Sequence, residues 1–197
     1  NAGLRQLRIA ETEKYAHVTV FFNGGKQTLH PGEEHKMVPS PDVATYDLKP
    51  EMSCEGVADE VIGAINGDNC FVLVNFANGD MVGHTAQDNA IVRSIEAMDT
   101  QVGRILDEAV KNDFSVVLTA DHGNCEEYID PYTGEPHTQH TCYPVPFLVI
   151  DTHYWVMRTG GGLSNVAPTI LQLMGLEQPK GMTGESMLLD QVGPIEQ

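Results

Sequence analysis

The sequence predicts an α/β fold with a mainly parallel sheet and helices on both of its faces. Two observations lead to this prediction. Short apolar runs typical of buried strands recur along the chain, and amphipathic stretches of helical length lie between them. A parallel connection between neighbouring strands needs a dozen or more residues, and the spacing of these runs provides them.

Four runs are predicted strands. The first, YAHVTVFF at 15–22, is β-branched and aromatic and closes on a turn at Asn23-Gly24-Gly25. The other three are similarly apolar and cover residues 70–76, 115–120 and 146–150. Because ligands bind beyond the carboxyl ends of the strands in such sheets, the residues that follow each run are candidates for a site.

Three segments are predicted helices. Residues 87–112 carry apolar side chains at helical spacing on one face and charged side chains elsewhere. A second helix is expected from about 53 to 65. A third is expected over 164–174, because Ser164 suits an N-cap and Gly175 suits a helix stop.

Two long segments lie outside these elements. Residues 28–50 are rich in Pro, Gly and charge but end in the hydrophobic VATYDL, which indicates an ordered excursion rather than a linker. Residues 123–144 form the second segment. Loops longer than ~12 residues inside a compact domain are uncommon and often functional. The segment after Gly184 is expected to be partly frayed.

The composition excludes several classes of protein. Of 197 residues, 41% are apolar, so a sizeable core can form and the disordered and fibrous classes are excluded. The formal net charge of -17 is the opposite of what a nucleic-acid or anionic-membrane binder needs. No apolar run approaches the ~20 residues needed to cross a bilayer. Four cysteines without CxxC spacing indicate reduced thiols, so we expect a soluble cytoplasmic protein.

Acidic and imidazole side chains follow two of the predicted strands. The segment ANGDMVGHT, after the strand at 70–76, places Asp80 and His84 four residues apart. The segment DHGN, after the next strand, provides Asp121 and His122. Because the carboxyl ends of parallel strands share one edge of a sheet, we expect the two pairs to meet there.

The long loop that follows returns with HTQHTCYPVPF, so His137 and His140 arrive just before the next strand. We therefore predict a divalent metal site formed by Asp80, His84, Asp121, His122 and one of His137 or His140. Nitrogen and oxygen donors favour Mn²⁺ or Zn²⁺ over Ca²⁺, which takes oxygen ligands only. A site of two His and two Cys, using Cys125 and Cys142, is an alternative that would leave the aspartates without a role.

Five motifs together resemble a known family. In chain order they are ETEKYAHVTVFFNGG, SPDVATYDLKPEMS, VNFANGDMVGHT, LTADHGN and HTCYPVPF. From Leu4 to about Leu188 the chain resembles the cofactor-independent (2,3-bisphosphoglycerate-independent) phosphoglycerate mutases of the alkaline phosphatase superfamily. The resemblance implies an alkaline phosphatase-like fold and an isomerase that interconverts 3-phosphoglycerate and 2-phosphoglycerate in glycolysis through a phosphorylated serine.

The resemblance also implies two divalent metal ions, with Mn²⁺ favoured and Zn²⁺ or Co²⁺ as alternatives, and no requirement for 2,3-bisphosphoglycerate. It assigns the metal ligands as follows: Asp80, His84 and His140 to one ion, and Asp121 and His122 to the other. It casts Lys14 as a cation near the phosphoryl group. The family usually has Pro where this chain has Gly79, and Gly where it has Ala86.

The resemblance covers only part of a family member. Residues 1–190 correspond to the C-terminal part of the metal-binding phosphatase-like domain, and residues 191–197 to a tail. The nucleophilic serine and the inserted domain that clamps the substrate have no counterpart in the sequence, and there is no initiator Met or signal segment. We therefore expect an incomplete domain that supplies metal ligands and is inactive alone.

In the full-length enzyme, the resemblance implies a monomer that binds phosphoglycerate and has no nucleic-acid or membrane partner. Two other interpretations remain open. Another superfamily member, such as a phosphopentomutase or a metal-dependent phosphatase, would share the metal ligands but act on a different substrate. The second alternative is a non-catalytic metal-binding fragment. The motifs VATYDLKPEMS and ETEKYAHVTVFFNGG favour the glycolytic mutase, because they lie outside the ligands that all relatives need.

Overall fold

The computed structural model describes residues 2–194, which belong to two units. The first unit runs to Asn112 and resumes over His122–Pro144. The second comprises Asp113–Asp121 and the chain from Val145 onward. Within the described residues, no helix combines the length and the apolar character that a membrane span requires.

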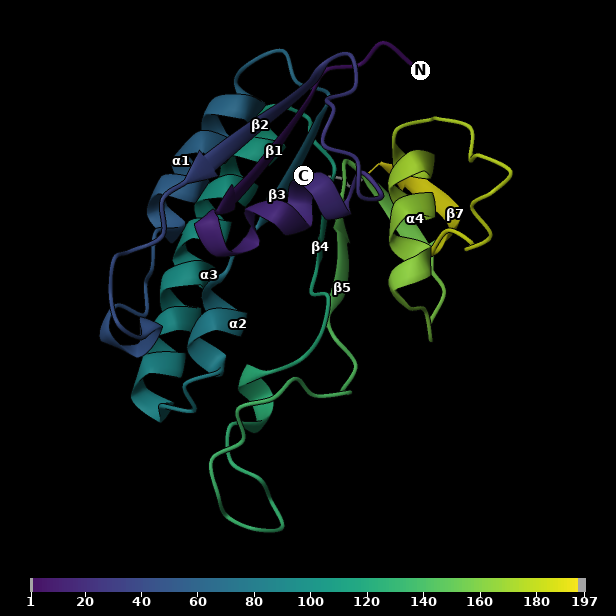
Figure 1. Ribbon diagram of the computed structural model, residues 1–197. Helices are drawn as coiled ribbons and strands as arrows, with labels where there is room; N and C mark the ends of the chain where they lie inside the picture. Colours follow the sequence, from purple (N-terminus) through teal and green to yellow (C-terminus); the bar gives the residue numbers. More distant parts are fainter. Residues whose placement is uncertain (1, 195–197) are drawn as a thin grey trace. The chain divides into compact units, whose positions relative to one another are not determined.

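Three parallel strands form the sheet of the first unit (Figure 1). They are β1 (Gln6–Glu11), β2 (Glu33–Val38) and β3 (Phe71–Asn75), in the spatial order β2-β1-β3. Gln6 of the central strand pairs with Glu33 on one side and with Phe71 on the other. The predicted parallel α/β arrangement is therefore confirmed in this unit.

The two crossovers of this sheet place helical segments on opposite faces. The chain passes from β1 to β2 through the π-helix η2 (His17–Phe21), and from β2 to β3 through α1 (Cys54–Ile65). In the order β2-β1-β3, the step from β1 to β2 runs toward one edge of the sheet, and the step from β2 to β3 runs toward the other edge. Because parallel crossovers are right-handed, opposite directions require opposite faces.

Side chains of β1 agree with this arrangement. The Arg8 guanidinium donates from Nη1 to the backbone carbonyl of Val18 in η2 at 3.3 Å. Glu11 lies three residues after Arg8, so its side chain points to the opposite face of the sheet. Its carboxylate accepts a 3.0 Å hydrogen bond from the backbone N–H of Ser53, which lies just before α1. The prediction of helices on both faces is confirmed.

The prediction of a strand over residues 15–22 is wrong. This segment is helical, with η2 preceded by the short 3-10 turn η1 (Thr12–Lys14). Val18 and Thr19 are both buried while Phe21 and Phe22 are exposed, as in a helix that rests one face on the sheet. A short β-branched run is compatible with either state by composition, and here β1 already fills the strand position.

Neither β1 nor β2 was predicted, because charged residues interrupt their apolar pattern. The charges are buried as a pair: Arg8 Nη1 lies 3.6 Å from Glu33 Oε1, and both side chains are almost inaccessible. Asn23 Nδ2 donates to the same carboxylate oxygen at 2.7 Å. The turn after η2 is thereby fixed to the two strands.

Two predicted helices of this unit are confirmed. They are α1 and the long α3 (Asp88–Lys111), and the two pack against each other. Buried Val57 and Val61 of α1 and buried Ile9 and Ala10 of β1 belong to the core of the unit. Three further short segments are helical and lie near the predicted site: η3 (Tyr46–Leu48), α2 (Asn78–Gly83) and η4 (Cys125–Glu127).

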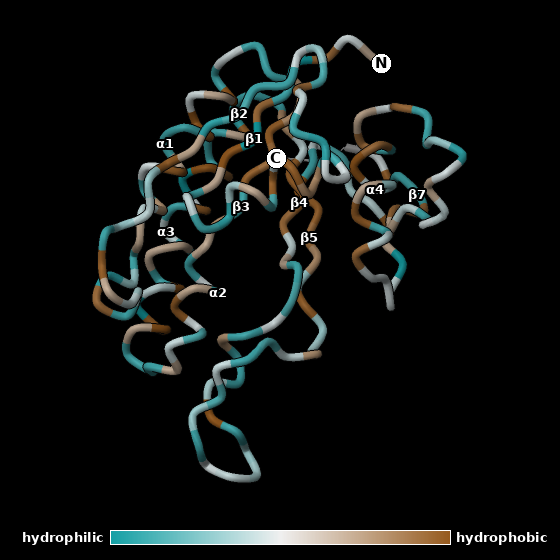
Figure 2. Tube along the Cα trace, viewed as in Figure 1, coloured by the Kyte–Doolittle hydropathy of each residue, from teal (hydrophilic) through white to brown (hydrophobic). Residues whose placement is uncertain are grey.

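The second unit contains two antiparallel strand pairs and one helix. The predicted strands near 115–120 and 146–150 are present as β4 (Val116–Thr119) and β5 (Phe147–Ile150), and they pair antiparallel. Figure 2 shows both in hydrophobic colours, whereas the loop over 123–144 in the first unit is mostly hydrophilic or neutral. The predicted helix over 164–174 begins as a 3-10 turn, η5 (Leu163–Asn165), and continues as α4 (Val166–Leu173).

The segment after Gly184 contains a strand. β7 (Leu188–Pro194) pairs antiparallel with β6 (His153–Met157), so the predicted fraying does not apply to residues 188–194. The predicted tail over 191–197 therefore begins inside β7, and its residues 195–197 lie outside the described residues.

Ala86 has a left-handed backbone, with φ of 50°. Because a Cβ disfavours this conformation, we expect Ala86→Gly to raise the free energy of unfolding by about 1 kcal/mol. Ala90→Gly, a substitution inside α3, should lower it by a similar amount. Denaturant unfolding measures the free energy of unfolding of both variants. A lower free energy of unfolding for Ala86→Gly than for the wild type would contradict the claim that the Ala86 backbone is strained.

Glu33 is expected to make stability depend on acid pH. Burial by itself raises the pKa of its carboxyl, but hydrogen bonds from Asn23, the His30 backbone and His35, with the charge of Arg8, lower it to about 2. A depressed pKa contributes stability above the unfolded value of about 4.5, and this contribution is lost as the pH falls toward 2. The shift corresponds to about 3 kcal/mol.

The stability difference between the wild type and Glu33→Gln should therefore shrink as the pH falls from about 5 to about 2. Denaturant unfolding at several pH values measures this difference. Glu34→Gln is the matched control, because Glu34 is an exposed partner of Arg5 and should show little pH-linked loss. A difference for Glu33→Gln that does not change with pH would contradict the role of the buried carboxylate.

Candidate metal centre

The short helix α2 places two predicted ligands on one face. Asp80 lies in its first turn and His84 caps its end, so the two side chains are four residues apart and point the same way. Fully buried Asn78 holds the start of α2, because its Nδ2 donates to the carbonyls of Pro50 and Glu51 at 2.9 and 3.0 Å.

The sheet brings Lys14 to Asp80. Lys14 follows β1 and Asp80 follows β3, and these two strands are parallel neighbours, so their carboxyl ends lie side by side. The Lys14 ammonium donates to Asp80 Oδ2, and the two side chains are only 9% and 13% exposed. This ion pair leaves the other carboxylate oxygen, Oδ1, facing the loop over 123–144.

Imidazole nitrogens gather at that second oxygen. His84 Nε2 and His140 Nε2 each lie 2.9 Å from Asp80 Oδ1, and they lie 3.2 Å from each other. The ligand atoms of these three residues all fall within 4.8 Å of one another. His122 Nε2 lies slightly further away, at 3.9 Å from the same oxygen.

Hydrogen bonds orient two of the rings. His84 Nδ1 lies 2.6 Å from the carbonyl of Thr138, and His122 Nδ1 lies 3.3 Å from the carbonyl of Gly123. A carbonyl can only accept, so these contacts favour a proton on Nδ1 and direct the lone pair on Nε2 toward Asp80. Two acceptors, an imidazole nitrogen and a carboxylate oxygen, then face each other. A divalent cation between them satisfies both, so the donor set fits a metal ion of the Mn²⁺ or Zn²⁺ type.

The charge state of Asp80 also suits a ligand. Burial alone raises the pKa of its carboxyl, but the hydrogen bond and charge of Lys14, with the nearby His84 and His140, outweigh burial and lower the pKa. Asp80 is therefore a carboxylate at neutral pH, which is the form that binds a cation.

Of the predicted ligands, Asp80, His84, His122 and His140 lie together. The choice between His137 and His140 is resolved by distance, because His137 Nδ1 instead contacts the carbonyl of Glu127 at 2.8 Å. Asp121 ends a segment of the second unit, directly before His122 in the chain, and stays a predicted ligand.

The alternative site with two cysteines is not supported. The Cys125 thiol donates to the carbonyl of Gly79 at 2.9 Å. Burial, together with the charges of Glu126 and Asp80, raises the pKa of this thiol to about 11. Among the described residues, the side chains whose ligand atoms lie within 4.8 Å of one another are Asp80, His84 and His140, and Cys125 is not among them. Cys142 is exposed.

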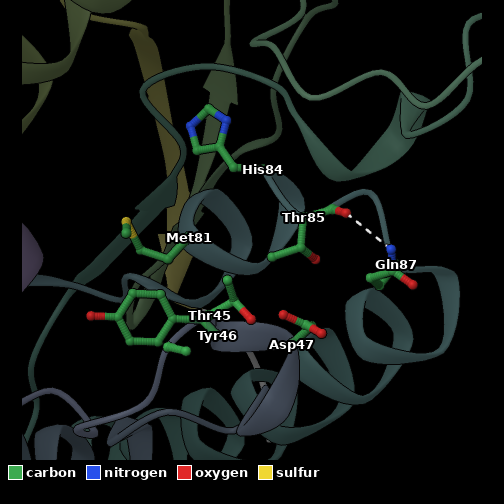
Figure 3. A pocket seen from close by; sticks show the side chains of 8 residues that line it. Thr45, Tyr46, Asp47, Met81, His84, Thr85 and Gln87 are labelled. Carbon is green, nitrogen blue, oxygen red and sulfur yellow. Dashed lines mark hydrogen bonds between the residues drawn. The ribbon is translucent and has the colours of Figure 1, made fainter.

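A cavity of about 450 Å³ opens beside His84. Figure 3 labels most of the residues that line it, from η3 and from the end of α2: Thr45, Tyr46, Asp47, Met81, His84, Thr85 and Gln87. The Tyr46 hydroxyl donates to Glu13 Oε1 at 2.8 Å, and Glu13 precedes Lys14. The VATYDL segment is thereby connected to the strand end that carries Lys14.

Three residues around the cluster were missed by the sequence analysis. Asn124 Nδ2 lies 3.5 Å from Asp80 Oδ1, and the Glu126 carboxylate accepts from Thr141. The only signal in the sequence is position: Asn124 and Glu126 follow His122 closely, and Thr141 follows His140. Proximity to a ligand in sequence does not by itself indicate which side chains contact it.

The parallel sheet and the carboxylate-imidazole cluster at its strand ends define a metal-binding α/β protein. The chain belongs to the metalloenzyme superfamily, whose profile matches residues 1–178. Within it, the chain is similar to curated 2,3-bisphosphoglycerate-independent phosphoglycerate mutases, as the motifs predicted. It is 52% identical over 187 residues to the protein of Cellvibrio japonicus and 53% identical over 187 residues to that of Ectopseudomonas mendocina.

These alignments cover 94% of this chain but only 36% and 37% of the two relatives, so the chain spans little more than a third of their length. A solved structure gives the same result. The chain matches a Leishmania mexicana phosphoglycerate mutase, described at low cobalt concentration, with a TM-score of 0.86 and 32% identity. That match covers 95% of this chain and 38% of the other. The alkaline phosphatase-like fold is thereby confirmed.

The cluster predicts which histidine binds metal. We expect His140→Ala to weaken Mn²⁺ binding at least ~100-fold, because it removes a ring nitrogen that faces Asp80 directly. His137→Ala, in the same loop, should leave the affinity nearly unchanged. Calorimetric titration of the metal-free chain compares the two, and equal losses for both variants would contradict the assignment.

Proposed function

We propose that this chain supplies the metal-binding part of a 2,3-bisphosphoglycerate-independent phosphoglycerate mutase, which interconverts 3-phosphoglycerate and 2-phosphoglycerate. The observation that carries the proposal is the convergence of Asp80, His84 and His140 beside Lys14. The identity of 52–53% to named mutases supports it. The reaction is a step of glycolysis, which gives the cytoplasm as the proposed location.

The cluster of Asp80, His84 and His140 supports the proposed role of these three residues, and the resemblance implies the roles of Asp121 and His122. Asp80, His84 and His140 would hold one divalent ion, and Asp121 and His122 would contribute to a second. When bound, the ions supply Lewis acidity that neutralises charge on phosphoryl oxygens and lowers the pKa of the serine that is transiently phosphorylated. That serine is proposed to lie outside the region of the relatives that this chain matches.

Lys14 is proposed as the positive charge next to the transferred phosphoryl group. Its ammonium holds Asp80 Oδ2, so it keeps the carboxylate turned with Oδ1 toward the imidazoles. An ammonium is a compact charge with three donors, and one hydrogen bond to Asp80 leaves two for oxygens of the substrate. Lys14 would thus orient the ligand and the phosphoryl group together.

For the metal we propose Mn²⁺, with Zn²⁺ or Co²⁺ as alternatives. One carboxylate and two imidazoles form a mixed donor set that all three ions accept. The Leishmania enzyme, which was studied with cobalt, supports the same range. The name of the relatives supports turnover without added 2,3-bisphosphoglycerate.

We further propose that residues 1–190 belong to the C-terminal part of the metal-binding domain, and that this part extends through β7 to Pro194 rather than giving way to a tail at residue 191. The full-length enzyme is proposed to act as a monomer on phosphoglycerate, without nucleic-acid or membrane partners. A net charge of -17 repels such a substrate, so binding would depend on the metal ions and on positive side chains outside this chain.

The proposed activity is tested with protein expressed from the complete coding sequence and loaded with Mn²⁺. We expect it to interconvert the two phosphoglycerates without added 2,3-bisphosphoglycerate, and Asp80→Asn to lower the rate ~10³-fold because it removes the ligand charge. The isolated 197-residue chain should show no turnover above the blank.

Three results would contradict the proposal. A preference of the complete protein for pentose phosphates would indicate another mutase of the superfamily. Full activity of Asp80→Asn would remove the metal centre from the reaction. Turnover by the isolated chain would show that it is not an incomplete enzyme.

A further inference from the structure

Two side chains join the arms of the loop over 123–144. Glu126 belongs to the arm that leaves His122, and Thr141 to the arm that carries His140. The Thr141 hydroxyl donates to Glu126 Oε1, and the backbone N–H of Asn124 donates to Glu126 Oε2 at 2.8 Å. We refer to Glu126 and Thr141 as the clasp.

The backbone of the two arms is paired at the same place. Gly123 and Thr141 form an isolated antiparallel bridge, in which the Thr141 N–H donates to the Gly123 carbonyl at 3.0 Å. A side chain at position 123 would collide with the clasp, because its Cβ would lie 2.1 Å from Glu126 Oε1 and 2.2 Å from Thr141 Oγ1. The glycine of the DHGN motif therefore leaves room for the clasp.

The clasp continues to the metal cluster through Asn124. This side chain is only 5% exposed, and its Nδ2 lies 3.5 Å from Asp80 Oδ1. It packs directly on Gly83 of α2, where an added Cβ would lie 2.3 Å from Asn124 Oδ1. A continuous set of contacts thus runs from Thr141 through Glu126 and Asn124 to Asp80.

His140 depends on this support more than the other ligands do. The rings of His84 and His122 each have a backbone carbonyl at Nδ1. In the described part of the chain, no hydrogen bond orients Nδ1 of His140, and its side chain is 47% exposed. Its ring instead stacks on that of His122, with centroids 3.6 Å apart. The clasp joins the backbone next to His122 to the backbone next to His140, and these two backbone segments determine where the two stacked rings lie.

We propose that Glu126 and Thr141 are positioning residues for the metal centre. The clasp fixes the backbone next to His140 against the backbone next to His122, so that the imidazole of His140 faces Asp80 before any ion binds. Without the clasp, part of the binding free energy must order the loop, and the affinity for the ion falls. This inference rests on the metal centre proposed above.

The test is a calorimetric titration of the metal-free chain with Mn²⁺. Thr141→Val keeps the shape of the side chain and removes the hydroxyl, so we expect a loss of affinity of about 10-fold or more. Thr141→Ser keeps the hydroxyl and should retain the affinity. Glu126→Gln replaces one acceptor by a donor and should also weaken binding.

The control is Glu135→Gln, which removes the same charge from an exposed position of the same loop. The double variant Thr141→Val with Glu126→Gln should lose less than the product of the two single losses, because both substitutions break one contact. Thermal unfolding of the metal-free variants separates a positioning role from general destabilisation, since only the former lowers the affinity at an unchanged melting temperature.

Each outcome decides the inference. Loss of affinity in Thr141→Val with retention in Thr141→Ser supports it. Equal Mn²⁺ affinity of the wild type and Thr141→Val contradicts the role of the clasp while leaving the metal centre intact. A loss of affinity in Glu135→Gln as large as that in Glu126→Gln also contradicts the role of the clasp. A wild-type chain that binds no Mn²⁺ contradicts the metal centre itself and the clasp with it. If Thr141→Val does not fold, the Mn²⁺ affinities of Glu126→Gln and Glu135→Gln are compared instead. A loss in Glu126→Gln alone supports the inference, and equal affinities contradict it.

Discussion

The carboxylate of Asp80 is the group on which the arrangement of the site depends. One of its oxygens accepts from the buried ammonium of Lys14, and the other faces Nε2 of His84 and of His140. The lone pair on His84 Nε2 and the Asp80 carboxylate oxygen therefore lie 2.9 Å apart, and both need a positive charge between them. A divalent cation meets that need, which explains why the surrounding contacts hold the acceptors together.

The order of the strands explains why these residues can meet. In a sheet with the order β2-β1-β3, the chain reverses its winding between β1 and β3, and a ligand site is expected at that point beyond the strand ends. Lys14 comes from the end of β1, and Asp80 from the end of β3. The imidazoles of the loop over 123–144 complete the cluster. The order of the strands therefore brings Lys14 and Asp80 together, and the loop adds the His140 imidazole, which is the third residue of the proposed metal site.

The parts predicted correctly from the sequence were those with a strong local pattern. The helix over 87–112 has regular apolar spacing, and the DHGN and GDMVGH segments follow apolar strands. The strand predicted over 15–22 was wrong because β-branched composition does not distinguish a strand from a helix resting on a sheet. β2 was missed because the buried charge of Glu33 is stabilised by contacts with other segments, namely Arg8 of β1 and Asn23 after η2. The choice of His140 over His137, and the clasp, likewise depend on contacts between distant segments.

The most direct test of the account is a crystal structure of the chain grown with Mn²⁺, with anomalous diffraction recorded to locate the metal. We expect an ion bonded to Asp80 Oδ1 and to Nε2 of His84 and His140 at ~2.0–2.3 Å, with Lys14 still on Asp80 Oδ2. An ion bound elsewhere, or three side chains that keep their positions with no ion between them at saturating Mn²⁺, would contradict the central claim.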